Sequence, residues 1–172
     1  MNTSSNFRAL TQSVWALSGE LNSESILDLL QARYCTNPDL PLLFLIDSPG
    51  GLADSSIGLV HELNPFTSLE TRALGFCASA AVTLLLAGTH RTAHIGTRFI
   101  THPCMYDEGI VTGASAADLA ARVESDNRLW ARLFAARTRK RKESFWRDWF
   151  SKERAFDAAE ALNLGIIDAV LT

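Results

Sequence analysis

The chain has 172 residues, with 16 Lys or Arg, 19 Asp or Glu and a formal net charge of -3. Its composition, 47% hydrophobic and 20% charged, excludes disordered, collagen-like and disulfide-scaffold proteins. We expect a single domain over residues 1–172, with residues 1–12 as a short N-terminal segment. Three cysteines without paired spacing and the lack of an apolar run of about 18 residues predict a cytoplasmic protein outside the membrane. No pattern points to a metal or cofactor.

The apolar residues predict alternating strands and helices. The continuous run Leu42–Ile46 is typical of a parallel strand covered on both faces, and spacings of three and four predict helices. Expected strands cover Val14–Leu17, Leu42–Ile46, Thr71–Leu74, Thr92–Ile95, Arg98–Thr101 and Ile166–Val170. Expected helices cover Ser23–Tyr34 (capped by Asn22 or Ser23), a segment ending at Glu62, Ala80–Ala87, a long helix from Ser115, Glu143–Phe150 and Asp157–Asn163. This order predicts an α/β fold of repeated βαβ units.

The long helix from Ser115 has an amphipathic pattern. Ser115 and Asp118 have capping-box spacing, and the expected inner face carries Leu119, Val123, Trp130, Leu133 and Phe134.

A basic cluster, Arg137 with residues 139–142, follows that helix. With a negative net charge and no interleaved aromatic residues, the cluster indicates a solvated face, and we predict no nucleic-acid binding. Trp146 and Trp149 are interpreted as packing or subunit-contact residues.

Two expected turns each join a buried strand to a helix, and both point towards one crevice. Gly50 and Gly51 allow close approach of another backbone, and their amides are available to an anion or oxyanion. In the second turn, over Gly75–Ser79, small residues surround the Ser79 hydroxyl at a helix N-terminus. Ser79 is therefore either a nucleophile or a simple helix cap.

His102 is the histidine best placed to serve as a base. It ends the strand Arg98–Thr101 and precedes Pro103, a position that carries its imidazole over the same sheet edge. Spacing alone leaves a structural role for His102 open.

Four ordered segments resemble the Clp protease proteolytic subunit (ClpP) family. They are Asp47-Ser48-Pro49-Gly50-Gly51, Gly75-Phe76-Cys77-Ala78-Ser79, Ile100-Thr101-His102-Pro103, and Ala158-Ala159-Glu160-Ala161 with Leu164-Gly165-Ile166-Ile167-Asp168. The resemblance runs from about Ser13 to Thr172. It implies a crotonase/ClpP-like α/β fold with a long handle helix, and a serine endopeptidase that hydrolyses unfolded proteins or peptides inside an oligomeric chamber.

The resemblance also implies roles for individual residues. Ser79 corresponds to the nucleophile, His102 to the general base, and the amides of Gly51 and Ala80 to the oxyanion hole. The family's third member is an aspartate, and an ungapped comparison puts Glu153 in its place, with Asp148 and Asp157 as neighbouring alternatives.

The sequence departs from the family pattern at several points. Asp47 replaces the usual Asn, Ala80-Ala81 replaces Met-Gly, and Pro103 directly follows His102. The segment from Met105 to Gly113, where the family clamps two rings together, is acidic here, with Asp107 and Glu108.

The resemblance implies a homo-oligomeric ring of seven subunits, and it leaves open whether two rings stack as a pair. Docking of a partner AAA+ unfoldase is left open, because the segment before the first expected strand is short.

Other functions stay open on the sequence. An inactive ring subunit paired with an active paralogue fits the substitution at Glu153 and the altered clamp. A crotonase-type acyl-CoA enzyme would share the fold, and a Ser/Lys dyad would use Lys152 in place of His102.

Overall fold

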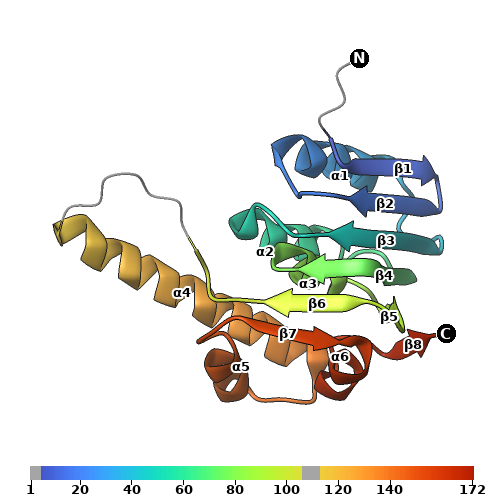
Figure 1. Ribbon diagram of the computed structural model, residues 1–172. Helices are drawn as coiled ribbons and strands as arrows, with labels where there is room; N and C mark the ends of the chain where they lie inside the picture. The colour runs from blue at the N-terminus through green and yellow to red at the C-terminus, as the bar shows by residue number, and fades with distance from the viewer. Residues whose placement is uncertain (1–4, 106–112) are drawn as a thin grey trace.

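A sheet of eight strands forms the centre of the molecule, with the helices packed around it (Figure 1). The structure is a computed structural model that describes residues 5–105 and 113–172. The strands are β1 (Phe7–Thr11), β2 (Val14–Ser18), β3 (Leu42–Ser48), β4 (Leu69–Ala78), β5 (His90–His94), β6 (Arg98–Thr101), β7 (Arg154–Asp157) and β8 (Ala169–Leu171). The helices are α1 (Ser23–Cys35), α2 (Ala53–Glu62), α3 (Ala80–Leu85), α4 (Gly113–Thr138), α5 (Glu143–Trp149) and α6 (Ala158–Leu164).

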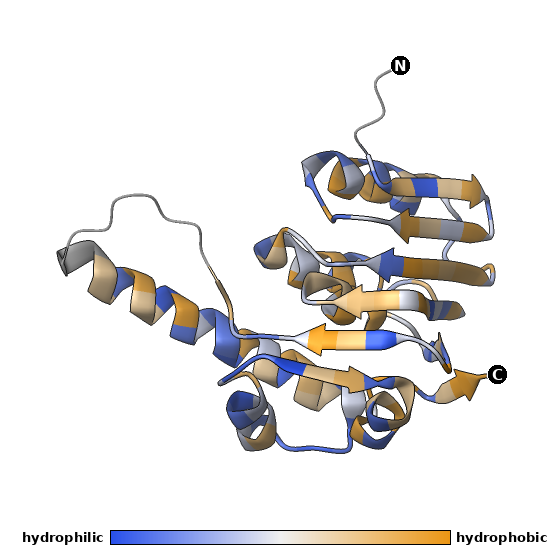
Figure 2. Ribbon diagram, in the orientation of Figure 1, coloured by the Kyte–Doolittle hydropathy of each residue, from blue (hydrophilic) through white to orange (hydrophobic). Residues whose placement is uncertain are grey.

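Parallel pairing links β2, β3, β4, β5 and β8 in that order, which confirms the predicted α/β class. The prediction that the apolar run of β3 is covered on both faces holds for one face only: Phe44 and Ile46 are fully buried, whereas Leu43 and Leu45 on the other face are half-buried. Trp15 of β2 packs edge-to-face on Phe44 and on Phe66, at ring-centroid distances of 6.0 and 5.5 Å. In Figure 2 strands β2 and β3 are hydrophobic over most of their length.

Strand β4 is longer than the sequence pattern predicted, and it changes partners along its length. Residues 70–73 pair with β5, whereas residues 76–78 pair with β6. The predicted turn over Gly75–Ser79 is therefore wrong for residues 75–78, which continue the strand. The extension forms because β6 supplies a second parallel partner just where β5 ends, and it carries the chain to Ser79.

Two short strands were not predicted from the sequence. The first, β1, lies antiparallel to β2 at the edge of the sheet, and only Phe7 within it is buried. The second, β7, lies antiparallel to β6. Neither segment has the apolar alternation that marks a strand, because each lies at a sheet margin with few inward side chains.

The end of the chain differs from the expected strand Ile166–Val170. Gly165 adopts φ 77° and ends α6, and the Ile166 amide bonds back to the Ala161 carbonyl at 2.9 Å. Ile166 and Ile167 are thus buried in a helix-ending turn, and only Ala169–Leu171 forms β8. The predicted cap of α1 is confirmed as Asn22, whose side chain accepts from the Ser25 amide at 2.8 Å.

Helix α4 begins at Gly113, earlier than expected, and its first half projects from the body of the molecule (Figure 1). Trp130, Leu133 and Phe134 are buried as predicted, Val123 packs on the core, and Leu119 is half-buried. The predicted helix start at Ser115, and the capping box with it, is wrong, because α4 already begins at Gly113 and Ser115 lies inside the helix. The interior of the acidic segment from Met105 to Gly113 lies outside the residues that are described. No helix in the described part of the chain is long and apolar enough to span a membrane.

The basic cluster and the two tryptophans largely follow the predictions. Residues 139–142 are exposed, whereas Arg137 is half-buried and donates to Asn64. Burial, together with the charges of Arg91 and Arg139, lowers the pKa of Arg137.

Trp146 is fully buried against Phe134, with ring centroids 5.0 Å apart.

An ion pair between Arg91 and Asp168 joins β5 to the final turn of the chain. The Asp168 carboxylate accepts from the Arg91 amide at 2.9 Å, from Nε at 3.1 Å and from Nη2 at 2.8 Å. Nη1 of Arg91 donates to the Arg137 carbonyl near the end of α4 at 3.1 Å. Burial alone would raise the pKa of Asp168, but the hydrogen bonds and charge of Arg91 outweigh it and lower that pKa.

We therefore expect Asp168→Asn to destabilise the fold in a pH-dependent way. At neutral pH the free energy of unfolding should fall by about 2 kcal/mol, because the substitution leaves the mostly buried Arg91 charge unpaired. Since the folded-state pKa is lowered, the stabilisation is present above the unfolded value of about 4 and lost as pH falls through the folded value. Urea unfolding followed by tryptophan fluorescence at fixed protein concentration measures both effects.

The matched control is Asp39→Asn, in an exposed turn, which should change stability by less than about 0.5 kcal/mol. An equal loss in both variants, or a loss that grows towards acidic pH, would contradict the assigned role of Asp168.

Candidate active site

The two glycine-containing turns meet at the carboxyl ends of β3 and β4. Gly50 has φ 97°, and a Cβ added there would lie 2.7 Å from both the Ser79 Cβ and the Ala78 carbonyl oxygen. The Asp47 carboxylate accepts from the Phe76 amide at 2.8 Å and ties the same two segments together. Gly50 is therefore required by the close approach of the chain that carries Ser79.

Ser79 has a strained backbone and a hydroxyl that caps nothing. Its φ is 54° and its ψ is -125°, a conformation that residues other than glycine rarely adopt. It occupies the N-cap position of α3, yet its side chain makes no capping hydrogen bond. The interpretation of Ser79 as a simple cap is therefore wrong. The Ser79 amide donates to the Ile100 carbonyl at 2.8 Å, which holds the turn against β6.

Cys77 is the other nucleophilic side chain near this turn, but it is fully buried. Burial, and secondarily the charge of Asp47, raises the pKa of the Cys77 thiol. The thiol is therefore neutral at physiological pH, and thiolates rather than thiols are the reactive form.

Two backbone amides next to Ser79 are without an acceptor. Leu21 bonds to the peptide groups on either side of Gly51, through the Gly50 carbonyl at 2.6 Å and the Leu52 amide at 2.9 Å. The Gly51 N–H itself takes no part in these two hydrogen bonds. Neither the Gly51 amide nor the Ala80 amide donates to another described residue. Unpaired N–H groups at such a turn are suited to bind an oxyanion.

His102 follows β6, the parallel neighbour of the end of β4, and so lies near Ser79. Both residues line one small pocket, together with Thr83, Thr101, Trp130, Phe134 and Phe150. Trp149 donates its indole N–H to Thr101 Oγ1 at 2.8 Å and fixes the end of β6 against α5. The Ser79 hydroxyl makes no hydrogen bond to His102 among the interactions of the described residues; such catalytic bonds often form only when substrate is bound.

The His102 ring is oriented by its own chain neighbour. Its Nδ1 lies 2.7 Å from the carbonyl oxygen of Pro103. Because a carbonyl oxygen only accepts hydrogen bonds, Nδ1 carries the hydrogen, and Nε2 of a neutral ring is left as the acceptor. That tautomer is the one a general base needs if it is to take a proton at Nε2.

The structure separates the candidate acids. The antiparallel register of β6 and β7 ends with Thr101 opposite Arg154, so its continuation sets His102 opposite Glu153. Facing residues of an antiparallel pair share one side of the sheet. Even so, Glu153 is exposed and makes no hydrogen bond or ion pair to another described residue.

The other candidates lie elsewhere. Asp148 is highly exposed, and its carboxylate lies 3.8 Å from the Arg154 guanidinium. Asp157 caps α6 by accepting from the Glu160 amide at 2.9 Å, and it pairs with Arg98 at the far end of β6. Lys152 is exposed and does not line the pocket that Ser79 and His102 share.

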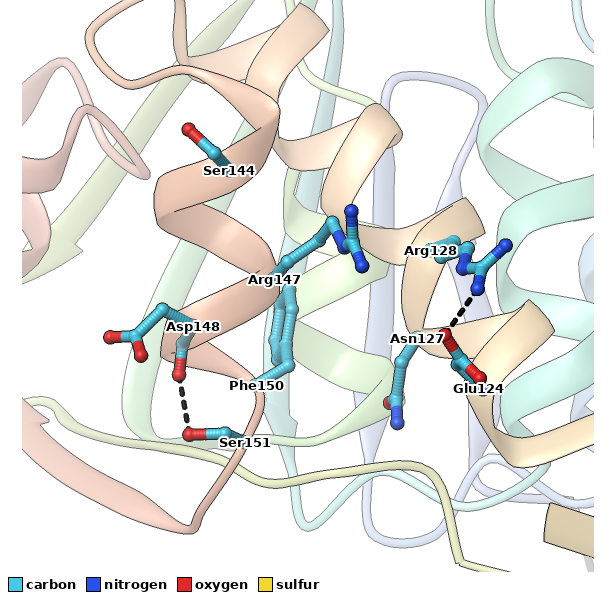
Figure 3. Close-up of a pocket in the computed structure, with 8 residues that line it drawn as sticks. All are labelled: Glu124, Asn127, Arg128, Ser144, Arg147, Asp148, Phe150 and Ser151. Atoms are coloured by element: carbon cyan, nitrogen blue, oxygen red, sulfur yellow. Dashed lines mark hydrogen bonds and ion pairs between the residues drawn. The ribbon is translucent and has the colours of Figure 1, made fainter. Parts of the chain in front are cut away.

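A larger, open cleft of about 370 Å³ lies between α4 and α5 (Figure 3). Glu124, Asn127, Arg128, Ser144, Arg147, Asp148, Phe150 and Ser151 line it. Phe150 lines both this cleft and the Ser79 pocket, so the two adjoin. Asn127 accepts from the Cys104 amide at 2.8 Å, a contact that sequence reasoning missed because one polar residue on a long helix carries no signal. No group of three or more metal-ligating side chains occurs among the described residues.

Comparison with known proteins identifies the family. The Clp protease family model matches residues 8–172. The ATP-dependent Clp protease proteolytic subunit 2 of Frankia casuarinae is 32% identical over 141 residues, which is 78% of this chain and 63% of that subunit. Subunit 3 of Rhodococcus jostii is 28% identical over 179 residues, 96% of this chain and 84% of that subunit. The chain belongs to the Clp protease family.

The chain is also similar to a Clp subunit that carries a different number. Proteolytic subunit 1 of Mycolicibacterium paratuberculosis is 30% identical over 159 residues, 88% of this chain and 74% of that subunit. The sheet and helices described above are consistent with the fold of the family, as the resemblance implied.

Proposed function

We propose that this chain is a serine endopeptidase in which Ser79 is the nucleophile and His102 the general base. The observation that carries the proposal is the Ser79 turn: a strained backbone holds a hydroxyl that, like the Gly51 and Ala80 amides, has no hydrogen-bond partner among the described residues. Strained backbone of this kind concentrates at functional sites. Membership of the Clp protease family supports a peptide substrate.

The reaction follows from the placement of these groups. His102 Nε2 takes the hydroxyl proton as Ser79 Oγ attacks the carbonyl carbon of the scissile bond. The amides of Gly51 and Ala80 donate to the oxyanion of the tetrahedral intermediate. The imidazolium then gives its proton to the leaving amine, and water, activated by the same ring, hydrolyses the acyl-enzyme. Glu153, opposite His102 in strand register, supplies negative charge near the imidazolium.

The assembly is part of the same proposal. We expect a ring of this chain, seven-membered and stacked in pairs, in the cytoplasm, which confines the site to substrates that enter a chamber. The relatives are named as subunits of ATP-dependent proteases, so an ATPase that delivers unfolded chains is the expected partner.

A fluorophosphonate probe followed by intact-mass analysis tests the nucleophile. We expect one adduct per chain, located at Ser79 by peptide mapping and much slower to form in His102→Ala. Because the probe reacts with activated serines, an assembled protein that takes no adduct at Ser79 would refute the proposal.

A non-catalytic ring subunit is the second candidate, and the exposed carboxylate of Glu153 favours it. Such a subunit would copurify with a second Clp-type chain and hydrolyse no peptide alone. Peptide turnover by the purified chain excludes it.

A further inference from the structure

The orientation of His102 depends on a backbone carbonyl rather than on a carboxylate. The Nδ1–H donates to the Pro103 carbonyl at 2.7 Å, within the short range of N–H···O hydrogen bonds. In an acid-assisted triad this position belongs to a carboxylate, which holds the imidazole in its working tautomer. Here Glu153 lies one residue beyond the last paired position of β6 and β7, where Thr101 faces Arg154, and it is exposed and bonded to no other described residue.

A carbonyl that belongs to a loop needs something to fix its direction. The Pro103 carbonyl and the Cys104 amide are the two ends of one trans peptide group, so they point in opposite directions. The Cys104 N–H donates to Asn127 Oδ1 at 2.8 Å. This bond sets the plane of the peptide group, and with it the direction of the carbonyl that His102 uses.

Asn127 stands on a firmly packed part of α4. Trp130, three residues further on and on the same helix face, is buried and lines the pocket that Ser79 and His102 share. Trp130 and Phe134 pack on Phe150, with ring centroids 6.1 and 4.9 Å apart. Asn127 itself is half-buried and lies in the cleft beside Glu124 and Arg128 (Figure 3).

We propose that Asn127 is a positioning residue for the general base, acting through the Pro103–Cys104 peptide group on His102. The line of contacts runs from Asn127 Oδ1 to the Cys104 N–H, and from the Pro103 carbonyl to the His102 Nδ1–H. Donation to Asn127 polarises the peptide group and makes its carbonyl a better acceptor. This inference rests on the proposed peptidase function and adds a residue that the sequence does not single out.

Substitutions at Asn127 test the proposal. Asn127→Leu keeps the branched shape of the side chain but removes the acceptor, and Asn127→Ala is a second variant in case the larger leucine perturbs folding. Both should lower kcat about 10- to 100-fold, with little change in KM, because a misoriented base affects the chemical step. Asn127→Asp keeps an acceptor for the Cys104 amide and should retain activity within about threefold.

Glu124→Gln is the matched control, because Glu124 lies on the same helix in the same cleft and bonds only to exposed Arg128. It should match the unaltered protein in kcat and in the pH–rate profile, whereas Asn127→Leu should displace the acidic limb of that profile. Glu153→Gln should lose far less than the roughly 10⁴-fold that follows loss of an acid bonded directly to the base. A roughly 10⁴-fold loss in Glu153→Gln would overturn the proposal. So would an Asn127→Leu variant whose kcat and pH–rate profile equal those of Glu124→Gln.

An activity-independent readout separates this inference from the proposed function. In Ser79→Ala protein with ¹⁵N-labelled histidine, long-range ¹H–¹⁵N spectra report which nitrogen of His102 carries the hydrogen. The Nδ1–H tautomer should dominate and should decrease when Asn127→Leu is added. An unaltered protein without peptidase activity would refute the proposed function alone, whereas an Nε2–H tautomer would refute the role of the carbonyl and Asn127.

Discussion

Replacing Ser79 with alanine is expected to lower kcat/KM for peptide hydrolysis by about a million-fold, which would leave only the roughly 10³- to 10⁴-fold acceleration that binding and the oxyanion hole provide. Without Oγ there is no acyl-enzyme, and the amides of Gly51 and Ala80 have no attached intermediate to stabilise. His102→Ala should produce a loss of similar size, because nucleophile and base act as one unit. A fluorogenic peptide, assayed with the assembled protein, measures both.

Ser144→Ala is the appropriate control, since Ser144 is an exposed serine on α5. It should leave turnover and thermal stability unchanged. Equal turnover in the Ser79 and Ser144 variants would show that another residue is the nucleophile.

The second large effect is expected from Gly50→Ala. The new Cβ would lie 2.7 Å from the Ser79 Cβ and 2.9 Å from the Ala80 amide nitrogen, and φ is 97° at this position. Strain and overlap together should lower the free energy of unfolding by about 2–4 kcal/mol. Displacement of Ser79 from its amide donors should reduce kcat/KM by at least about 100-fold. Urea unfolding and peptide hydrolysis measure the two effects separately.

Gly58→Ala provides a control in which the free energy of unfolding is expected to rise instead of fall. Gly58 lies inside α2, and a Cβ there would meet nothing within 4 Å. This substitution should stabilise the protein by about 0.4–1 kcal/mol and leave hydrolysis unchanged. If Gly50→Ala behaves like Gly58→Ala, the contact between the two turns is not needed for the site.

The sequence was sufficient to predict the central strands and the amphipathic helices. In the run Leu42–Ile46, Leu42, Phe44 and Ile46 are buried on one face of the sheet, and Trp130, Leu133 and Phe134 line the inner face of α4. These elements are readable because burial fixes the type of residue at each position. At the margins of the sheet burial is slight, so β1 and β7 lack such a pattern and were not predicted.

The candidate site was only partly predictable for a related reason. Ser79, His102, Gly50 and Gly51 belong to residue types with distinctive chemistry, so a sequence pattern or a resemblance can single them out. The strained φ of Ser79 is a property of the folded backbone, set by the pairing of β4 with β6. The acceptor on His102 is a main-chain carbonyl, and every residue has one, so its use leaves no trace in the sequence.

The bond between Asn127 and the Cys104 amide has a consequence for a chain that is synthesised from its N-terminus. Gly51, Ser79 and His102 all leave the ribosome before Asn127 does. A nascent or prematurely ended chain therefore possesses the proposed nucleophile and base but not the side chain proposed to aim the base. With these roles, the order of residues along the polypeptide delays full proteolytic competence until α4 has been made and packed.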